Sequence, residues 1–162
     1  MNDFINDKIY KLKQKKILNP EIDLRILLNH AKIIKRNIIL STFKIEQINV
    51  NFFNLLFNRR LNNEPVSKII NKKSFWKDDF YVDQFVLDPR PETEGIIEES
   101  LSIINDKKAK LKILDIGTGS GALAISLARE FNNSKILAID VSRKAIEVAK
   151  KNIFMKNMEK KI

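Results

Sequence analysis

The chain has 162 residues, of which 44% are hydrophobic and 31% are charged, and this balance excludes an intrinsically disordered protein. It has no cysteine, and no apolar run approaches the roughly 20 residues that span a bilayer, so we expect neither a thiolate metal site nor a membrane protein, and we expect a cytoplasmic location. The net charge of +10 would favour binding to polyanions. Because the basic residues are scattered along the chain, we interpret them as the solvated faces of helices.

The N-terminal part of the chain has helical periodicity. One helix face is predicted by the spacing i, i+3, i+4, i+7 of Leu24, Leu27, Leu28, Ala31 and Ile34. A second stripe of the same kind consists of Ile45, Ile48, Phe52, Leu55 and Leu56, and residues 4–17 are more weakly amphipathic. These patterns predict a small helical bundle that ends near Arg60, and we assign residues 1–63 to this helical domain.

The middle of the chain changes in character. Residues 74–87 are aromatic and β-branched with a polar centre at Lys77, Asp78 and Asp79, which predicts a β-hairpin with its turn there. Pro89 and Pro91 follow, and Pro91 can serve as the first residue of a helix that runs to about Ile104. We assign residues 64–91 to a linker that contains the hairpin.

From residue 111 onward the pattern alternates between strand and helix. Strands are predicted at 111–116 and 135–139, and helices at 120–131 and 143–154. Such alternation indicates parallel strands with helical crossovers, the organisation of an α/β, Rossmann-like domain. Since two parallel strands do not make a stable sheet alone, residues 92–162 are expected to form an incomplete domain of this class.

A glycine loop follows the first predicted parallel strand. The loop has the sequence Asp115-Ile116-Gly117-Thr118-Gly119-Ser120-Gly121. Its three glycines have no side chains that would block a ligand from the backbone, and the next helix presents its N-terminal N–H groups. Asp140 follows the next strand, about 20 residues later, where doubly wound folds place an acid that accepts hydrogen bonds from ribose hydroxyls. The pattern predicts a nucleotide-type pocket.

Three interpretations of this loop are open. Gly117, Gly119 and Ala122 fit the fingerprint of NAD enzymes. Asp115 favours another ligand, because its carboxylate can meet an ammonium group, which S-adenosylmethionine has and NAD lacks. The loop also resembles the acidic-x-Gly-x-Gly-x-Gly loop of class I methyltransferases. The third interpretation is a glycine turn that only packs helix on strand.

The segment before the loop resembles the release factor glutamine methyltransferases. The residues that carry the resemblance, in order, are Arg59-Arg60, Glu64-Pro65-Val66, Phe75-Trp76 and, most specifically, Pro89-Arg90-Pro91-Glu92-Thr93-Glu94. The resemblance implies methyl transfer from S-adenosylmethionine to the side-chain amide nitrogen of the glutamine in the Gly-Gly-Gln motif of a release factor. It implies that residues 1–63 recognise this protein substrate and that residues 92–162 bind the cofactor.

The resemblance also implies roles for individual residues. The cofactor loop would consist of Gly117, Thr118, Gly119, Ser120 and Gly121, with Asp115 facing the methionine amino group and Asp140 the ribose. Neither nucleic acid nor a metal is implied, and we interpret the single histidine, His30, as structural. Arg90 and Glu92 would brace the pocket, or else form an ion pair or helix cap.

One family motif is missing from this sequence. In the family, an Asn-Pro-Pro-Tyr motif supplies acceptors for the glutamine amide, whereas the only Asn-Pro here, Asn19-Pro20, is followed by Glu21. We therefore name no catalytic residue, and we expect these 162 residues alone to have little or no activity. Two alternatives remain: a non-catalytic module that binds a release factor, and a methyltransferase for another protein or a nucleic-acid amino group.

Overall fold

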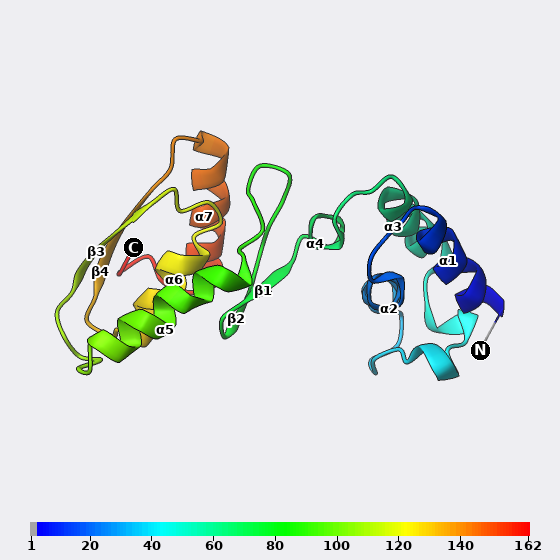
Figure 1. Cartoon of the computed structure of the whole chain (residues 1–162), viewed down its shortest axis with the longest axis horizontal. Coiled ribbons are helices and arrows are strands. Elements are labelled where there is room, and N and C mark those ends of the chain that lie inside the picture. The colour runs from blue at the N-terminus through cyan, green and yellow to red at the C-terminus, as the bar shows by residue number, and fades with distance from the viewer. Residues whose placement is uncertain (1–2) are drawn as a thin grey trace. The chain divides into compact units, whose positions relative to one another are not determined.

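The computed structural model describes residues 3–162, and the chain divides into two compact units, Met1–Ile70 and Asn71–Ile162 (Figure 1). The first unit is helical, and the second contains all the described strands. Each unit has its own hydrophobic core. Among the described residues, no core cluster crosses the boundary between the two units.

The first unit is built from four α-helices. Their bounds are α1 Asp3–Gln14, α2 Pro20–His30, α3 Val50–Leu61 and the short α4 Val66–Ile69, with 3-10 turns at Leu40–Thr42 and Ile45–Gln47. The predicted stripe is confirmed for Leu24, Leu27 and Leu28, which are fully buried on α2. It was predicted too long, because α2 ends at His30, and Ala31 and Ile34 lie beyond the helix. Helices α1, α2 and α3 pack against one another around this stripe, as the pattern of a small bundle predicts.

The predicted stripe of the third helix is wrong in its start and its face. Helix α3 begins only at Val50, because the side chain of Asn49 accepts a hydrogen bond from the N–H of Phe52 (3.0 Å) and caps the helix there. Ile45 therefore lies in a separate 3-10 turn and not in the helix. The buried face of α3 carries Phe53, Leu56 and Phe57, whereas Phe52 and Leu55 are exposed.

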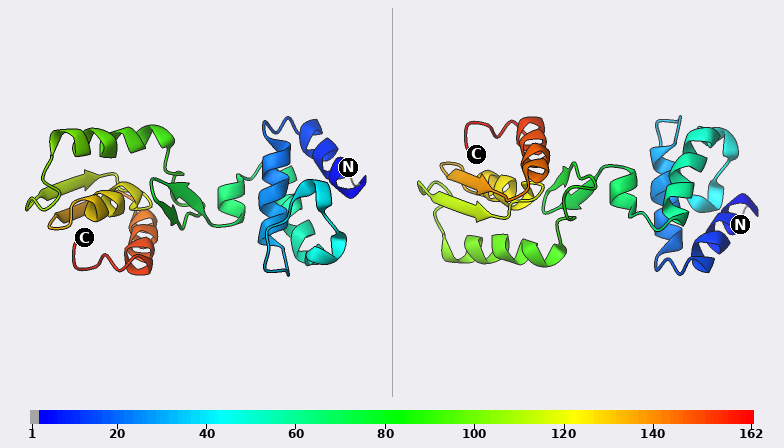
Figure 2. Two further views of the ribbon diagram at one scale, coloured as in Figure 1. Left: turned by 90° about the horizontal axis from the view of Figure 1, so that it is seen from below. Right: turned by 90° about the horizontal axis from the view of Figure 1, so that it is seen from above.

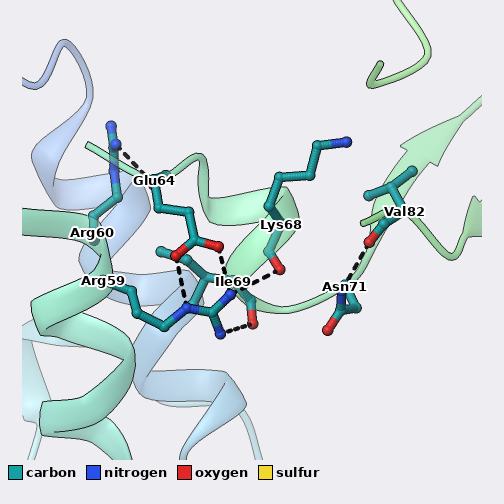
Figure 3. Close-up of polar contacts among 7 residues, drawn as sticks. All are labelled: Arg59, Arg60, Glu64, Lys68, Ile69, Asn71 and Val82. Carbon is teal, nitrogen blue, oxygen red and sulfur yellow. Dashed lines mark hydrogen bonds and ion pairs between the residues drawn. The ribbon is translucent and has the colours of Figure 1, made fainter. Parts of the chain in front are cut away.

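Arg59 organises the chain between α3 and α4 (Figure 3). Its Nε donates to Oε2 of Glu64 (2.7 Å), and its second guanidinium arm pairs with Oε1 of the same carboxylate. The guanidinium also reaches the carbonyl oxygens of Ile69 (3.3 Å) and Lys68 (3.4 Å) at the end of α4. Arg60 donates to the carbonyl of Glu64 (3.1 Å). The motif that carries part of the resemblance therefore fixes a backbone turn.

The second unit begins with the expected hairpin, which is shorter than predicted. Strands β1 (Lys73–Phe75) and β2 (Asp78–Phe80) pair antiparallel, with Phe75 opposite Asp78. The turn is therefore Trp76-Lys77, and Asp78 and Asp79 belong to the second strand. Residues 81–87 are not strand. Trp76 adopts a positive φ of 55°, which a bulky residue rarely does, and its residue type does not predict a turn at this position.

The remainder of the second unit alternates between strand and helix as predicted. Its elements are α5 Glu94–Ile103, β3 Lys112–Ile116, α6 Ala122–Glu130, β4 Lys135–Ile139 and α7 Arg143–Met155, with a 3-10 turn at Pro91–Thr93 before α5. β3 and β4 pair in parallel over their full lengths. The α/β organisation is thus confirmed, and it corresponds to the opening part of a Rossmann-like domain.

The strand pair is covered by helices on one face. In Figure 1, α5, α6 and α7 lie on one side of β3 and β4, and Figure 2 shows α6 between α5 and α7. Ile113 and Ile136 point to this side and belong to the core with α6. Leu114, Ile116, Leu137 and Ile139 alternate with them and are exposed. The uncovered face is apolar, as in sheets that are packed on both faces.

Candidate functional site

The glycine loop, residues 117–121, joins the end of β3 to the start of α6. Because β3 and β4 are parallel, their carboxyl ends lie at the same edge of the sheet. The N–H groups of Gly117 and Thr118 both donate to the carbonyl of Ile139, the last residue of β4 (2.8 and 2.9 Å). The loop is therefore anchored to the end of both strands, the position where α/β folds bind ligands.

The three loop glycines all have positive φ, but for different reasons. At Gly117 (φ 78°) no atom lies within 4 Å of where a Cβ would stand, and at Gly119 (φ 55°) only the Gly117 carbonyl oxygen does, at 4.0 Å. Both backbones are thus open to a ligand. A Cβ at Gly121 would lie 3.3 Å from the Cβ of Ala149 on α7. At Gly121 the missing side chain allows close packing of α7 against the loop, a reason that the sequence did not predict.

Asp140 lies at the carboxyl end of β4 and faces the loop. Its Oδ2 accepts a hydrogen bond from the N–H of Gly119 (2.9 Å), and its Oδ1 accepts one from the N–H of Ser142 (2.9 Å), which is the N-cap of α7. The side chain is half-buried. Asp140 thus positions both the loop and the start of α7, and each carboxylate oxygen has a further lone pair with which it could accept from a hydroxyl.

Asp115 and Thr118 lie at the bottom of the loop. Both are buried, and the Thr118 hydroxyl donates to Oδ2 of Asp115 (2.7 Å). A carboxylate at this depth costs free energy unless it is hydrogen-bonded, and the hydroxyl provides part of that compensation. Asp115 therefore brings a negative charge under the loop, next to the open backbone of Gly117.

Asn152, which no sequence motif identified as a candidate, makes a hydrogen bond to the loop. Asn152 on α7 is fully buried, and its Nδ2 donates to the carbonyl of Ser120 (2.8 Å). The signal was present, since Asn152 continues the buried face of α7 at the spacing set by Ala145, Val148 and Ala149. A polar residue on an apolar helix face requires a partner, but that partner could not be read from the sequence.

Other candidate residues lie outside this cluster. The side chains of Arg90 and Glu92 are exposed, while Glu94 of the same run accepts from the backbone N–H of Trp76 (2.7 Å). Phe75 is buried against Phe80 as a core residue. His30 is exposed in the helical unit and lies 5.9 Å from the ring of Phe52.

Residues 3–162 contain neither a candidate metal site nor a candidate membrane-spanning helix. No group of three or more His, Cys, Asp or Glu side chains is arranged to hold a metal ion within these residues. Within the same residues, no helix has the length and apolar character needed to cross a membrane.

The cluster suits a ligand that combines a cation with vicinal hydroxyls. Asp115 supplies a buried negative charge beneath the loop, and Asp140 supplies acceptor oxygens at its rim. The open backbone at Gly117 and Gly119 lets such a ligand approach closely. These features fit S-adenosylmethionine, in which an ammonium group and a ribose are joined in one molecule.

The sequence of this chain is similar to known methyltransferases. Residues 107–160 match a family model described as "Methyltransferase domain", which spans β3, α6, β4 and α7. A release factor glutamine methyltransferase of Buchnera aphidicola from Baizongia pistaciae is 38% identical over 90% of this chain and 53% of its own length. A protein of the same name from Caulobacter vibrioides is 38% identical over 88% of this chain and 50% of its length.

A bifunctional methyltransferase of Rickettsia typhi is 36% identical over 97% of this chain and 33% of its own length. The chain therefore spans about half the length of the release factor glutamine methyltransferases that it matches, and about a third of the bifunctional protein. The matches extend over both the helical unit and the unit that contains the loop. In sequence, the chain is therefore similar to the N-terminal portion of the release factor glutamine methyltransferases, and it contains a segment that matches the methyltransferase domain model.

Proposed function

We propose that the second unit binds S-adenosylmethionine at the glycine loop. The observation that carries this proposal is the cluster of Asp115, Asp140 and the open backbone of Gly117 and Gly119 at the end of β3 and β4. Asp115 would face the methionine ammonium group and Asp140 the ribose hydroxyls. Thr118 and Ser120 contribute by fixing the loop, since Thr118 bonds to Asp115 and the Ser120 carbonyl accepts from Asn152.

We further propose that the enzyme to which this sequence belongs methylates the glutamine side chain of the Gly-Gly-Gln motif in a peptide chain release factor, in the cytoplasm. The support is the name shared by several relatives at 34–38% identity. When bound, S-adenosylmethionine supplies an electrophilic methyl group. The helical unit, Met1–Ile70, is the proposed recognition surface for the protein substrate.

The residues present in this chain account for cofactor binding but not for activation of the substrate. A carboxamide nitrogen is a poor nucleophile, because its lone pair is delocalised into the carbonyl. Catalysis must therefore orient the amide and accept hydrogen bonds from its N–H groups as the nitrogen attacks. No Asn-Pro-Pro-Tyr sequence occurs in the chain, so we assign these acceptors to none of its residues. We expect the 162-residue chain to bind cofactor and to transfer little methyl.

Isothermal titration tests the cofactor proposal. S-adenosylmethionine and NAD are each titrated into the folded chain, into Asp140→Asn and into Glu147→Gln, a control that removes one negative charge from the exposed face of α7. We expect saturable binding of S-adenosylmethionine alone, weakened in Asp140→Asn and unchanged in Glu147→Gln. Binding of NAD without binding of S-adenosylmethionine would contradict the proposal.

A methyl-transfer assay tests the substrate. Tritiated S-adenosylmethionine is incubated with a class I release factor, or with the same factor carrying Gly-Gly-Asn, and with either a full-length relative or this chain. We expect glutamine-dependent transfer by the relative and almost none by this chain. Robust transfer by the chain alone would overturn the expectation that its residues lack the amide acceptors.

A further inference from the structure

Asn152 makes hydrogen bonds in two directions from inside the second unit. Its Oδ1 accepts from the backbone N–H of Tyr81 (2.8 Å), and its Nδ2 donates to the carbonyl of Tyr81 (2.9 Å) and to the carbonyl of Ser120 (2.8 Å). The orientation of the amide is determined by these partners. A flipped amide would place its NH₂ group against an N–H and its oxygen against two carbonyl oxygens.

The two partners of Asn152 belong to different functional segments. Ser120 is part of the glycine loop, and Tyr81 is the first residue after β2, where the chain leaves the hairpin toward the run at 89–94. Lys151 on α7 also contacts Tyr81 through a cation–π interaction, with its Nζ 3.2 Å from the centre of the tyrosine ring. A single face of α7 thus contacts the hairpin exit and the loop.

The contact between α7 and the loop extends over two consecutive loop residues. Ala149 lies one turn before Asn152 and is the residue that would meet a Cβ on Gly121 at 3.3 Å. Ala149 therefore limits how far the loop can move toward α7, while Asn152 prevents it from moving away. An apolar side chain of similar size could fill the space of Asn152, but it would leave two carbonyls and an N–H buried without a partner.

We propose that Asn152 is a positioning residue for the cofactor loop, which it holds in a fixed place relative to the backbone of Tyr81. The inference rests on the proposed function, because it assigns the loop to cofactor binding. Asn152 does not touch the cofactor in this proposal. It acts through the Ser120 carbonyl, so its loss should change loop geometry and cofactor affinity together.

The composition of the chain makes the loop directly observable. The sequence has only four glycines, of which Gly117, Gly119 and Gly121 form the loop and Gly95 lies in α5. Selective ¹⁵N-glycine labelling therefore gives an amide spectrum with three loop signals and one internal reference. These spectra are recorded without ligand, so they report loop position whether or not S-adenosylmethionine binds.

The test compares three variants with the unsubstituted chain. Asn152→Asp places a carboxylate oxygen against the two carbonyls, and Asn152→Ala removes all three hydrogen bonds. Val148→Ala is the matched control, because Val148 is buried on the same helix but packs with Val82 and Val86 and not with the loop. Circular dichroism confirms folding, and calorimetry gives the dissociation constant for S-adenosylmethionine.

We expect both Asn152 variants to shift the loop glycine signals but not that of Gly95. They should weaken S-adenosylmethionine binding about tenfold or more, the factor that corresponds to one lost hydrogen bond. Val148→Ala should leave the loop signals and the affinity within about twofold of the unsubstituted chain.

Unchanged loop signals and affinity in a folded Asn152 variant would overturn the proposal. So would failure of both Asn152 variants to fold, because Asn152 would then be required for the fold as a whole. If the unsubstituted chain does not bind S-adenosylmethionine, the proposed function fails, while the ligand-free spectra still decide whether Asn152 positions the loop.

Discussion

The different environments of two glycines predict opposite effects of the same substitution. Gly121→Ala places a Cβ at φ 78°, where an L-residue costs about 1–2 kcal/mol, and 3.3 Å from the Cβ of Ala149, where overpacking adds about 1 kcal/mol or more. The free energy of unfolding of the second unit should therefore fall by about 2–3 kcal/mol. Gly95→Ala meets open space in helix α5 and should raise it by about 0.5 kcal/mol.

The assay is urea unfolding followed by tryptophan fluorescence. Trp76 is the only tryptophan, and its indole N–H donates to Oε1 of Glu130 (2.8 Å), so its emission reports on the second unit alone. Equal denaturant slopes for both variants would show that only stability has changed. A Gly121→Ala chain within about 0.5 kcal/mol of the unsubstituted protein would refute the argument from close helix packing.

Further predictions concern charged side chains. The hydrogen bond from Lys77 lowers the pKa of Glu130 in the folded chain. The ionised Glu130 side chain therefore stabilises the fold fully above the ordinary pKa of glutamate, about 4.3, and this stabilisation is lost as the pH falls through the lowered pKa. Trp76 fluorescence should show this acid destabilisation, and Glu130→Gln should reduce it; an unchanged acid limb in Glu130→Gln would contradict the assignment. Arg59→Lys should lower the stability of the helical unit by about 1 kcal/mol, because lysine cannot replace the two-armed contact with Glu64 or the bonds to the α4 carbonyls. The loss of stability is measured from the helical circular dichroism signal during urea unfolding. Lys11→Gln, which breaks an exposed ion pair with Asp7, is the control, and its free energy of unfolding should stay within about 0.5 kcal/mol of that of the unsubstituted chain.

The sequence predicted those parts of the fold that depend on local patterns. Strand β4 and the start of α7 were predicted to the residue, because an apolar run and a capping serine define them locally. The face of α3 was predicted wrongly, because Asn49 caps the helix after the first two residues of the apparent stripe. A hydrophobic period alone does not show where its helix begins.

The contacts that the sequence could not predict are those between distant segments. Asn152 bonds to Tyr81, 71 residues earlier, and Glu130 accepts from Trp76, 54 residues earlier. Each of these residues looks ordinary in its own helix. The loop residues were found because glycines and acids at fixed spacing form a local motif, whereas the residues that hold the loop are defined only by packing.

The hydrogen bonds that hold the loop in place bear on cofactor binding and not on methyl transfer. Its hydrogen bonds come from the carbonyl of Ile139 and the side chains of Asp140, Asn152 and Asp115, which lie on β3, β4 and α7 or directly after them. None of these supports comes from the uncovered face of the sheet, where Leu114 and Leu137 are exposed. The described supports of the loop therefore all lie within residues 71–162, and no residue of this chain is assigned as an acceptor for a glutamine amide. We accordingly expect cofactor affinity and methyl transfer to be independent properties of this chain, so that S-adenosylmethionine binding is measurable in it even where transfer is absent.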